Sequence, residues 1–295
     1  MPKLYVLGGG GWIPTARRLT NCYLIETRRS AILLDCGVGA ARLLDPMLQA
    51  VLARVPRALV LLSHYHHDHV EGLHYLLHLL RDHEVTIAAP PSSVTRASPA
   101  EVLGRYGSTP LLPKPIATWR EQFPRGFEIV ELKEGKNQVA GETVEVLGQP
   151  HSDPSVALRV RDVAYVTDTA ARKESVPFAK SAAVLIHDAW LDPEDEAAGH
   201  PDLAHHGTAV GAARIAAEAQ PGQLLLGHLN PRYDASRLER MLVAAMQIFP
   251  RTRLADDFAT LELREPAEEK PAAAAPALEA TSTVETSDEG FHDPA

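Results

Sequence analysis

Hydrophobic runs and polar breaks alternate along the first half of the chain. Mostly apolar segments bounded by Gly, Asn or charged residues predict buried strands at 4–7, 21–26, 31–35 and 58–62. The spacing of apolar residues predicts helices at 41–54, starting or kinked at Pro46, and at 72–81. The tract 90–126 is rich in Pro, Ser and Gly, and its apolar residues follow neither the helical nor the strand period. Two interpretations remain for this tract, a lid and a substrate-side insertion.

The second half repeats the mixture of strands and helices. Helices are predicted at 210–219, capped by Thr208, and at 236–248, where Ser236 and Glu239 have the spacing of a capping box. The predicted strands are 143–147, 155–160, 163–167, 183–187, 223–227 and 258–263. Two halves of mixed strands and helices predict an α/β fold of layered sheets with helices outside.

Composition separates a folded body from a tail. From Glu265 onward the chain is mostly Pro, Ala, Glu, Ser and Thr, and it carries much of the formal charge of -9. Such a segment cannot bury enough apolar surface to offset its ordering entropy. We therefore expect one folded domain at 1–264 and a disordered acidic tail at 265–295, with a body too close to neutral to indicate a nucleic-acid partner by charge alone.

The chain carries few signals for an oxidising compartment or a membrane. Its two cysteines, Cys22 and Cys36, are best explained as reduced thiols in a chain that does not need disulfides. The N-terminal segment has no basic region followed by a long apolar one, and no apolar run approaches the roughly 18 residues of a membrane span. The sequence thus predicts a cytoplasmic protein with no membrane partner; it leaves the oligomeric state open, with a homodimer as one outcome.

Candidate chemistry is concentrated where the strand 58–62 ends. The stretch "LSHYHHDHVEGL" places His64, His66, Asp68 and His69 within six positions. Neutral imidazoles and carboxylates are common ligands of transition metals. His64 and His66 lie two apart and point to one side of an extended backbone, whereas Asp68 and His69 follow where the chain turns. This pattern suits two metal ions in one pocket better than one.

Three further candidate ligands stand at the ends of other predicted strands. They are His151, Asp168 and His228. Each alone is compatible with a cap or surface residue, but together with the histidine cluster they complete two sets of ligands. In contrast, His67, His74, His78, His83 and His205 do not repeat this placement, and we predict that they bind no metal.

These motifs resemble those of the metallo-β-lactamase superfamily, in particular its ribonuclease Z-like phosphodiesterases. The resemblance covers roughly residues 3–263 and rests on "VLGGGGWIPTARRLTN", "LLDCGVG", HxHxDH at 64–69, "PHSDPS", "YVTDTA", "LIHDAW", "HHGTA" and "LLLGHLNPRY", all in the family's order. It implies an αβ/βα sandwich of two mixed sheets with metals at one edge. It also implies two Zn²⁺ ions, with Mn²⁺ or Fe²⁺ as alternatives.

The same resemblance assigns ligands to each metal. One zinc would use His64, His66 and His151, and the other would use Asp68, His69 and His228. Asp168 would bridge the two ions.

Further roles are implied for residues beyond the ligands. Besides holding a metal, Asp68 would orient or deprotonate the metal-bound water that gives the hydroxide. His206, positioned by Asp188, would protonate the leaving oxygen. Asp188 stands where the family usually has Glu. Arg232, four residues after the last histidine ligand, would bind the substrate phosphate.

The chain departs from the ribonuclease Z pattern in one region. Enzymes that process transfer RNA carry a long arm between the third histidine and the bridging aspartate, but here His151 and Asp168 are only 17 residues apart. We therefore predict a phosphodiesterase acting on small or single-stranded phosphodiesters. An ester, thioester or lactone hydrolase remains the alternative and would need a larger apolar pocket, for which 90–126 is one source. A non-enzymatic scaffold is disfavoured because no ligand is missing.

Overall fold

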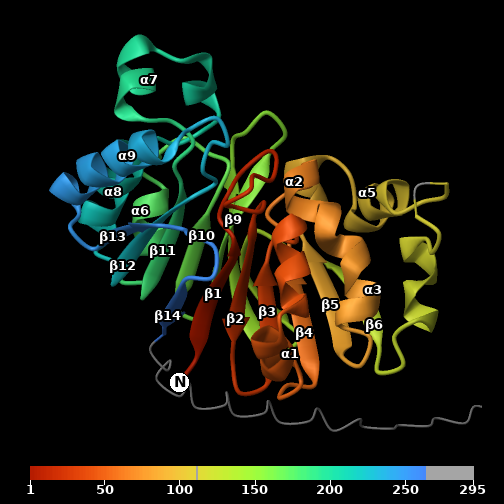
Figure 1. Cartoon of the computed structure of the whole chain (residues 1–295). Coiled ribbons are helices and arrows are strands. Elements are labelled where there is room, and N and C mark those ends of the chain that lie inside the picture. The colour runs from red at the N-terminus through yellow and green to blue at the C-terminus, as the bar shows by residue number, and fades with distance from the viewer. Residues whose placement is uncertain (111, 264–295) are drawn as a thin grey trace, which may run out of the picture. The chain divides into compact units, whose positions relative to one another are not determined.

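Two mixed sheets, each of seven strands among the described residues, form the centre of this computed structural model, which describes residues 1–110 and 112–263 (Figure 1). The first sheet has the order β14-β1-β2-β3-β4-β5-β6 and the second β13-β12-β11-β10-β9-β8-β7. The strands are β1 (Lys3–Gly8), β2 (Cys22–Glu26), β3 (Ser30–Leu34), β4 (Arg57–Leu61), β5 (Glu84–Ala89), β6 (Phe127–Glu131), β7 (Gly135–Val139), β8 (Glu142–Gln149), β9 (Ser155–Val160), β10 (Val163–Val166), β11 (Val184–Asp188), β12 (Gln223–Gly227), β13 (Thr252–Leu254) and β14 (Thr260–Glu262).

Each sheet combines antiparallel and parallel pairs. In the first sheet β1 to β3 pair antiparallel, and β3 to β6 run parallel. In the second sheet β7 to β10 pair antiparallel, and β10 to β13 run parallel. Parallel neighbours place their carboxyl ends at one edge, so loops after β4, β10 and β12 can carry side chains to a common place.

Helices cover the outer faces of the two sheets (Figure 1). The α-helices are α1 (Pro46–Leu52), α2 (His67–Val70), α3 (Leu76–Leu79), α4 (Ser92–Thr95), α5 (Pro99–Tyr106), α6 (Ser175–Ala179), α7 (Pro193–Ala198), α8 (Ala209–Ala219) and α9 (Ala235–Ile248). The 3₁₀ helices are η1 (Val38–Leu44), η2 (Glu71–Tyr75), η3 (Ile116–Glu121) and η4 (Pro201–Ala204). Among the described residues, no helix is both long and apolar enough to cross a bilayer.

Three apolar layers hold these elements together. The central layer lies between the sheets and includes Ile32 and Leu61 from the first sheet and Leu158 and Ile186 from the second. The other two layers lie between each sheet and its own helices. Because strand side chains alternate between faces, the sheets supply both the central and an outer layer. The predicted αβ/βα sandwich is confirmed.

Two local predictions were wrong. The predicted helix 72–81 is split into η2 and α3. At its start Gly72 must lack a side chain, because a Cβ there would lie 2.3 Å from the Gly37 carbonyl oxygen. The predicted cap Ser236 lies inside α9, whose cap is Asp234; its carboxylate accepts the backbone N–H of Arg237. Thr208 caps α8 as predicted.

The tract 90–126 forms short helices on the outer side of the first sheet. Leu103 of α5 and Trp119 of η3 are fully buried in the outer apolar layer, and Phe123 stacks against Phe127 of β6. These contacts anchor the tract to the first sheet. The expected tail 265–295 lies outside the described residues and stays a prediction.

Candidate metal centre

The chain segments after β4, β8, β10 and β12 bring the predicted ligands together. His64 and His66 lie in the loop that follows β4, and Asp68 and His69 lie one turn later in α2. His151 follows β8, Asp168 follows β10 and His228 follows β12. The site is thus built from both sheets.

The first group of candidate ligands contains three imidazoles, those of His64, His66 and His151. With Asp168, each can place one ligand atom so that all of these atoms lie within 4.8 Å of one another. The rings of His64 and His66 are 4.5 Å apart between centroids, and those of His66 and His151 are 5.1 Å apart. His66 also faces Asp153, whose Oδ2 lies 3.2 Å from its Nε2.

The second group contains Asp68, His69 and His228, and all three are buried. The Oδ2 atom of Asp68 lies 3.4 Å from Nε2 of His69 and 3.4 Å from Nε2 of His228. The same oxygen accepts the backbone N–H of Trp12 at 2.7 Å. Loop 9–13 therefore fixes the carboxylate of this group.

Asp168 lies between the two groups. Its Oδ1 is 3.8 Å from Nε2 of His64, 3.5 Å from Nε2 of His151 and 3.2 Å from Nε2 of His228. Its Oδ2 is 3.2 Å from Nε2 of His69. One buried carboxylate thus contacts imidazoles of both groups, as a shared ligand must.

Asp35, at the end of β3, is a buried partner that our sequence analysis missed. Its Oδ2 accepts hydrogen bonds from Nδ1 of His69 at 2.6 Å and from the Tyr165 hydroxyl at 2.6 Å. Ser63 donates both its backbone N–H and its hydroxyl to the same carboxylate. The signal was available: Asp35 is an acid at the end of the predicted strand 31–35, just as Asp168 directly follows the predicted strand 163–167. Such outer carboxylates orient the imidazoles that bind metals.

Hydrogen bonds turn the Nε2 atoms toward the centre. A carbonyl or carboxylate only accepts, so Nδ1 of His151 donates to the His205 carbonyl at 3.1 Å, as Nδ1 of His69 does to Asp35. The Ser63 hydroxyl proton goes to Asp35, so Nδ1 of His64 donates to the Ser63 oxygen at 3.0 Å. These hydrogen bonds select the tautomer in which Nε2 of the neutral ring carries the lone pair that can bind a metal.

The chemistry of this donor set fits metal ions. Nε2 of His64 and of His228 is buried without a hydrogen-bond partner in the described part of the chain. Buried polar atoms of this kind are costly unless a partner such as an ion meets them. Imidazole nitrogens with carboxylate oxygens suit Zn²⁺ and related transition metals.

The two groups hold protons differently. Burial and the neighbouring His69 lower the pKa of His64, and burial lowers that of His151. Burial also opposes charge on His69 and His228, but the carboxylates of Asp168 and Asp68 outweigh it, raising the pKa of His69 well above its usual value and that of His228 to about 9. In the second group, the protons on His69 and His228 therefore balance the negative charge of the carboxylates, which a metal cation would otherwise balance.

Backbone strain is concentrated at this centre. Asp35, Asp168 and His228 adopt left-handed conformations, with φ of 55°, 51° and 53°. Non-glycine residues rarely hold such angles unless surrounding contacts impose them. Nearby, Gly11 must lack a side chain, because a Cβ would lie 2.6 Å from the His228 ring.

The predicted proton donor lies beside the candidate ligands. Nδ1 of His206 is 2.9 Å from Oδ2 of Asp188, which also accepts the backbone N–H of Thr169. The His206 ring stacks on His228 at 5.2 Å and on Trp190 at 5.1 Å. With Asp168 and His228, His206 forms a third group of possible ligands, whose ligand atoms lie within 4.8 Å of one another.

Arg232 is exposed, and its guanidinium carbon lies 4.9 Å from the Trp12 ring centroid. Trp12 is 49% exposed and, as described, its backbone contacts Asp68. Trp12 thus contacts both Arg232 and Asp68 of the second group. Our sequence analysis did not assign Trp12.

The histidines predicted to bind no metal take part in none of the candidate ligand groups within the described residues. His67 points outward and meets Glu71 at 3.0 Å, and His83 is 3.0 Å from the Leu52 carbonyl.

Comparison with known proteins agrees with this architecture. The profile of a family described as "Beta-lactamase superfamily domain" matches residues 30–229. A ribonuclease Z from Salinibacter ruber is 29% identical over 330 residues, covering 92% of this chain and 98% of that protein. A ribonuclease Z from Metallosphaera sedula is 26% identical, covering 90% of this chain and all of the relative.

Solved structures share the fold. The metallo-β-lactamase fold protein YhfI from Bacillus subtilis aligns with a TM-score of 0.68 at 22% identity, covering 88% of this chain and 98% of that one. The short form of human tRNase Z aligns with a TM-score of 0.64 at 18% identity, covering 89% of this chain and 99% of that one.

Proposed function

This chain belongs to the metallo-β-lactamase superfamily and is a metal-dependent hydrolase related to ribonuclease Z; from that premise we propose that it is a dinuclear phosphodiesterase. The observation that carries the proposal is the position of Asp168, whose two oxygens contact imidazoles of both ligand groups. A single metal ion would leave one of these buried groups without a cation.

The proposed ligands follow the two groups. His64, His66 and His151 would hold one ion, Asp68, His69 and His228 the other, and Asp168 both. Zn²⁺ is our first choice because imidazoles dominate the donor set, with Mn²⁺ or Fe²⁺ in place of one or both ions. When bound, the ions would lower the pKa of a coordinated water and neutralise charge on the phosphoryl group.

The chain's own residues would orient the reactants. The Trp12 N–H holds Oδ2 of Asp68, so that this carboxylate can orient or accept a proton from water. Arg232 projects beside Trp12 at the surface and would bind a non-bridging phosphate oxygen.

His206 would move the proton to the leaving group. Asp188 accepts the Nδ1 hydrogen of His206, which leaves Nε2 as the atom that delivers a proton to the departing alkoxide. The Trp190 and His228 rings, stacked against it, restrict its rotation. Removing such an acid typically costs roughly 10² to 10⁴ in rate.

We further propose small or single-stranded phosphodiesters as substrates and the cytoplasm as the compartment. The ribonuclease relatives support a phosphodiester as the bond that is cleaved. The link between β9 and β10 is two residues long, so this chain has no arm at that position for a folded RNA. The buried free thiols Cys22 and Cys36 fit a reducing compartment.

Turnover by metal-loaded protein tests the proposal. Protein stripped with EDTA and reloaded with Zn²⁺ or Mn²⁺ should hydrolyse bis-p-nitrophenyl phosphate. It should prefer that diester to a panel of carboxylic esters, thioesters and lactones, the alternative class. Hydrolysis of the panel without hydrolysis of any phosphodiester would reject the proposal in favour of that alternative.

A further inference from the structure

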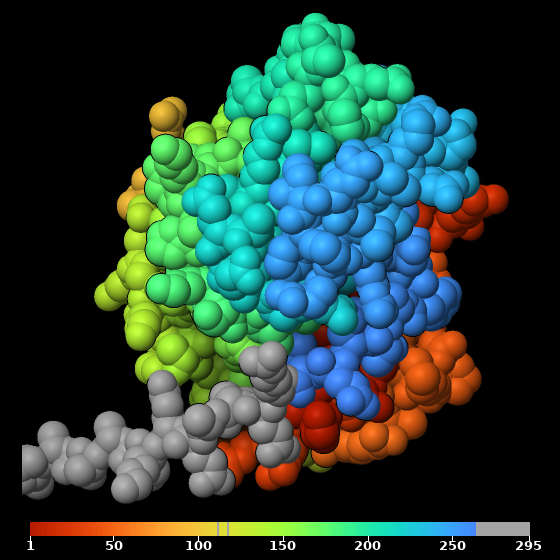
Figure 2. Space-filling view, turned by 90° about the vertical axis from the view of Figure 1, so that its left-hand side faces the viewer, coloured from red at the N-terminus to blue at the C-terminus, as the bar shows by residue number. Residues whose placement is uncertain are grey.

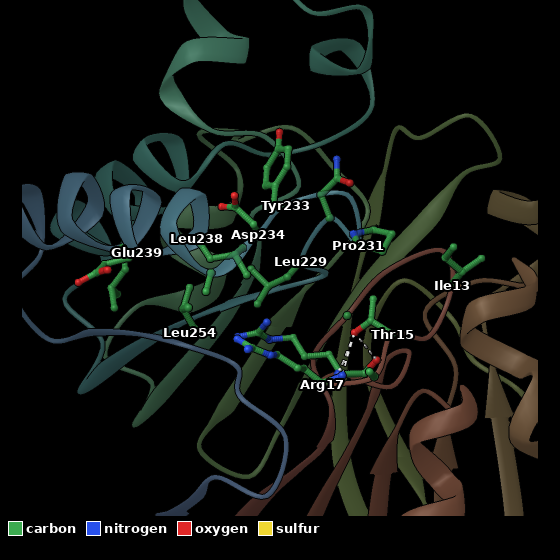
Figure 3. A pocket seen from close by; sticks show the side chains of 16 residues that line it. Ile13, Thr15, Arg17, Leu229, Pro231, Tyr233, Asp234, Leu238, Glu239 and Leu254 are labelled. Atoms are coloured by element: carbon green, nitrogen blue, oxygen red, sulfur yellow. Dashed lines mark hydrogen bonds between the residues drawn. The ribbon is translucent and has the colours of Figure 1, made fainter.

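A cavity of about 610 Å³ adjoins the candidate metal centre on the side of α9. Figure 3 shows it between Ile13, Thr15 and Arg17 on one side and Leu238, Glu239 and Leu254 on the other. Figure 2 shows the same neighbourhood from outside, where a segment near the N-terminus (red) emerges beside the region of α9 (blue). Its volume lies within the range of small-molecule pockets, roughly 300 to 1,000 Å³.

The cavity is connected to the centre through the backbone. Gly10, in its wall, pairs with Leu229, also in its wall and directly after His228. In the same loop, Trp12 donates its N–H to Asp68, and Ile13 already lines the cavity. Residues 10–13 therefore border both the centre and the cavity.

Apolar side chains form most of the lining. Leu229 and Leu238 are buried, Leu242 and Leu254 are half-buried, and Ile13 is 47% exposed. An apolar group that covers these side chains removes their remaining exposed surface from water, which favours its binding.

Several polar side chains of the lining have protein partners, whereas the side chains of Arg17 and Glu239, both exposed, have no partner among the described residues. Tyr233 donates its hydroxyl to Asp195, Asn230 Oδ1 accepts the Arg232 N–H, and Asp234 caps α9. Thr15 donates to the Arg18 carbonyl, and Arg18 pairs with Asp256. Apart from Arg17 and Glu239, the cavity thus offers few free polar groups, and its leucines and Ile13 offer apolar surface to a hydrocarbon.

We propose that this cavity binds an apolar ester group of the substrate, so that the substrate is a phosphodiester of an alkyl or aryl alcohol rather than of a nucleoside. This inference rests on the proposed phosphodiesterase function. Hydrolysis adds water to phosphorus and breaks the bond to one alcohol, which leaves with a proton; the apolar alcohol stays in the cavity as its phosphate monoester.

A series of p-nitrophenyl phosphate diesters tests the proposal. The second ester group is methyl, hexyl or thymidine (5′-linked), and release of p-nitrophenolate is followed. Each buried methylene contributes roughly fourfold to binding, so the hexyl ester should exceed the methyl ester at least about tenfold in kcat/KM. A thymidine ester better than the hexyl ester would overturn the apolar assignment.

Two matched substitutions test whether the preference for the hexyl ester arises in this cavity. Ala16 is exposed and lines the cavity, so Ala16→Trp should fill it, remove the hexyl advantage and leave methyl ester turnover unchanged. Ala100→Trp on α5 is the control, because Ala100 is equally exposed but lies on the other sheet's side. If Ala16→Trp does not fold by circular dichroism, Leu242→Asn replaces it. Equal loss for both esters would overturn the proposal.

Calorimetric binding of hexyl phosphate to metal-free protein separates this inference from the proposed function. Hexyl phosphate should bind to the wild type and to Ala100→Trp, and at least about tenfold more weakly to Ala16→Trp. If this binding pattern appears but no diester is hydrolysed with any metal, the cavity assignment stands and the phosphodiesterase proposal fails. If diesters are hydrolysed at rates that do not depend on the length of the alkyl chain, the phosphodiesterase proposal stands and the cavity assignment fails.

Discussion

The two groups of candidate ligands face each other across Asp168, but they differ in burial and in charge. The difference in burial comes from His66, whose side chain is 34% exposed; His64 and His151 of the first group are 1% and 3% exposed, and His69 and His228 of the second are 0% and 4% exposed. The second group has its own carboxylate, Asp68, and the first has none.

The two proposed metal positions differ in how firmly the fold holds their ligands. Asp35, with its four hydrogen bonds, fixes the second group in the core, so that this position is formed before any ion binds. The first group depends on imidazoles in a loop and on a shared carboxylate. We expect the second position to bind its ion more tightly and the first to exchange its ion more readily.

Removing the shared carboxylate should have the largest effect. Asp168→Ala takes a ligand from both positions, so we expect phosphodiesterase activity to fall by at least about 10³-fold, the upper range for loss of one electrostatic stabiliser. Metal content after dialysis, measured by mass spectrometry, should fall at both positions. A variant that keeps full metal content and activity would refute a shared site.

Removing a single ligand should weaken metal binding more in the second group than in the first. His228→Ala leaves Asp68 buried beside an incomplete second position, and we expect metal affinity to fall by more than about 100-fold, above the usual effect of losing only an outer hydrogen bond. His66→Ala, at the exposed edge, should cost less. Titration of both variants by calorimetry makes the comparison; a greater loss in His66→Ala would reverse our ranking of the positions.

The role of Asp35 can be tested without touching a ligand. Asp35→Asn keeps the shape but weakens the bond to His69, so affinity at the second position should fall roughly 10- to 100-fold. Tyr165→Phe removes one of the hydrogen bonds to Asp35 and is the milder control. Equal affinity in Asp35→Asn and wild type would mean that Asp35 only stabilises the fold.

The smallest expected effect is a pH dependence of the metal-free protein. The pKa of His228 is raised from 6.5 to about 9, so its ion pairs stabilise the fold fully below about pH 6.5 and are lost as the pH rises through about 9. The Tm in EDTA should therefore fall across this range, and zinc-loaded protein should not follow it. His228→Gln should flatten the dependence, whereas His151→Gln, whose pKa is lowered, should keep it. A Tm that rises with pH would contradict this assignment of charge.

The sequence predicted the layered fold because most strands are short apolar runs with clear ends. Four strands, β5, β6, β7 and β13, were missed: β5 and β6 flank the tract 90–126 that matched no period, β7 is largely polar, and β13 has only three residues. Helix ends were less predictable, since Asp234 and Ser236 both have capping side chains and only tertiary packing selects between them.

The candidate ligands could be predicted because all of them stand in the segments that follow strand ends, at β4, β8, β10 and β12. Their partners could not. Asp35, Tyr165 and Trp12 act through contacts between segments far apart in the chain, including one across 130 residues. No local pattern indicates such contacts. The cavity beside α9 has the same origin, because its walls come from the loop after β1 and from residues 229–254.

The most direct test of a dinuclear site is the number of metal ions that the intact protein holds. Metal-free protein titrated with Zn²⁺ and weighed by native mass spectrometry should bind two ions per chain, the second ion appearing with phosphodiesterase activity. Saturation at one ion with full activity would contradict the account.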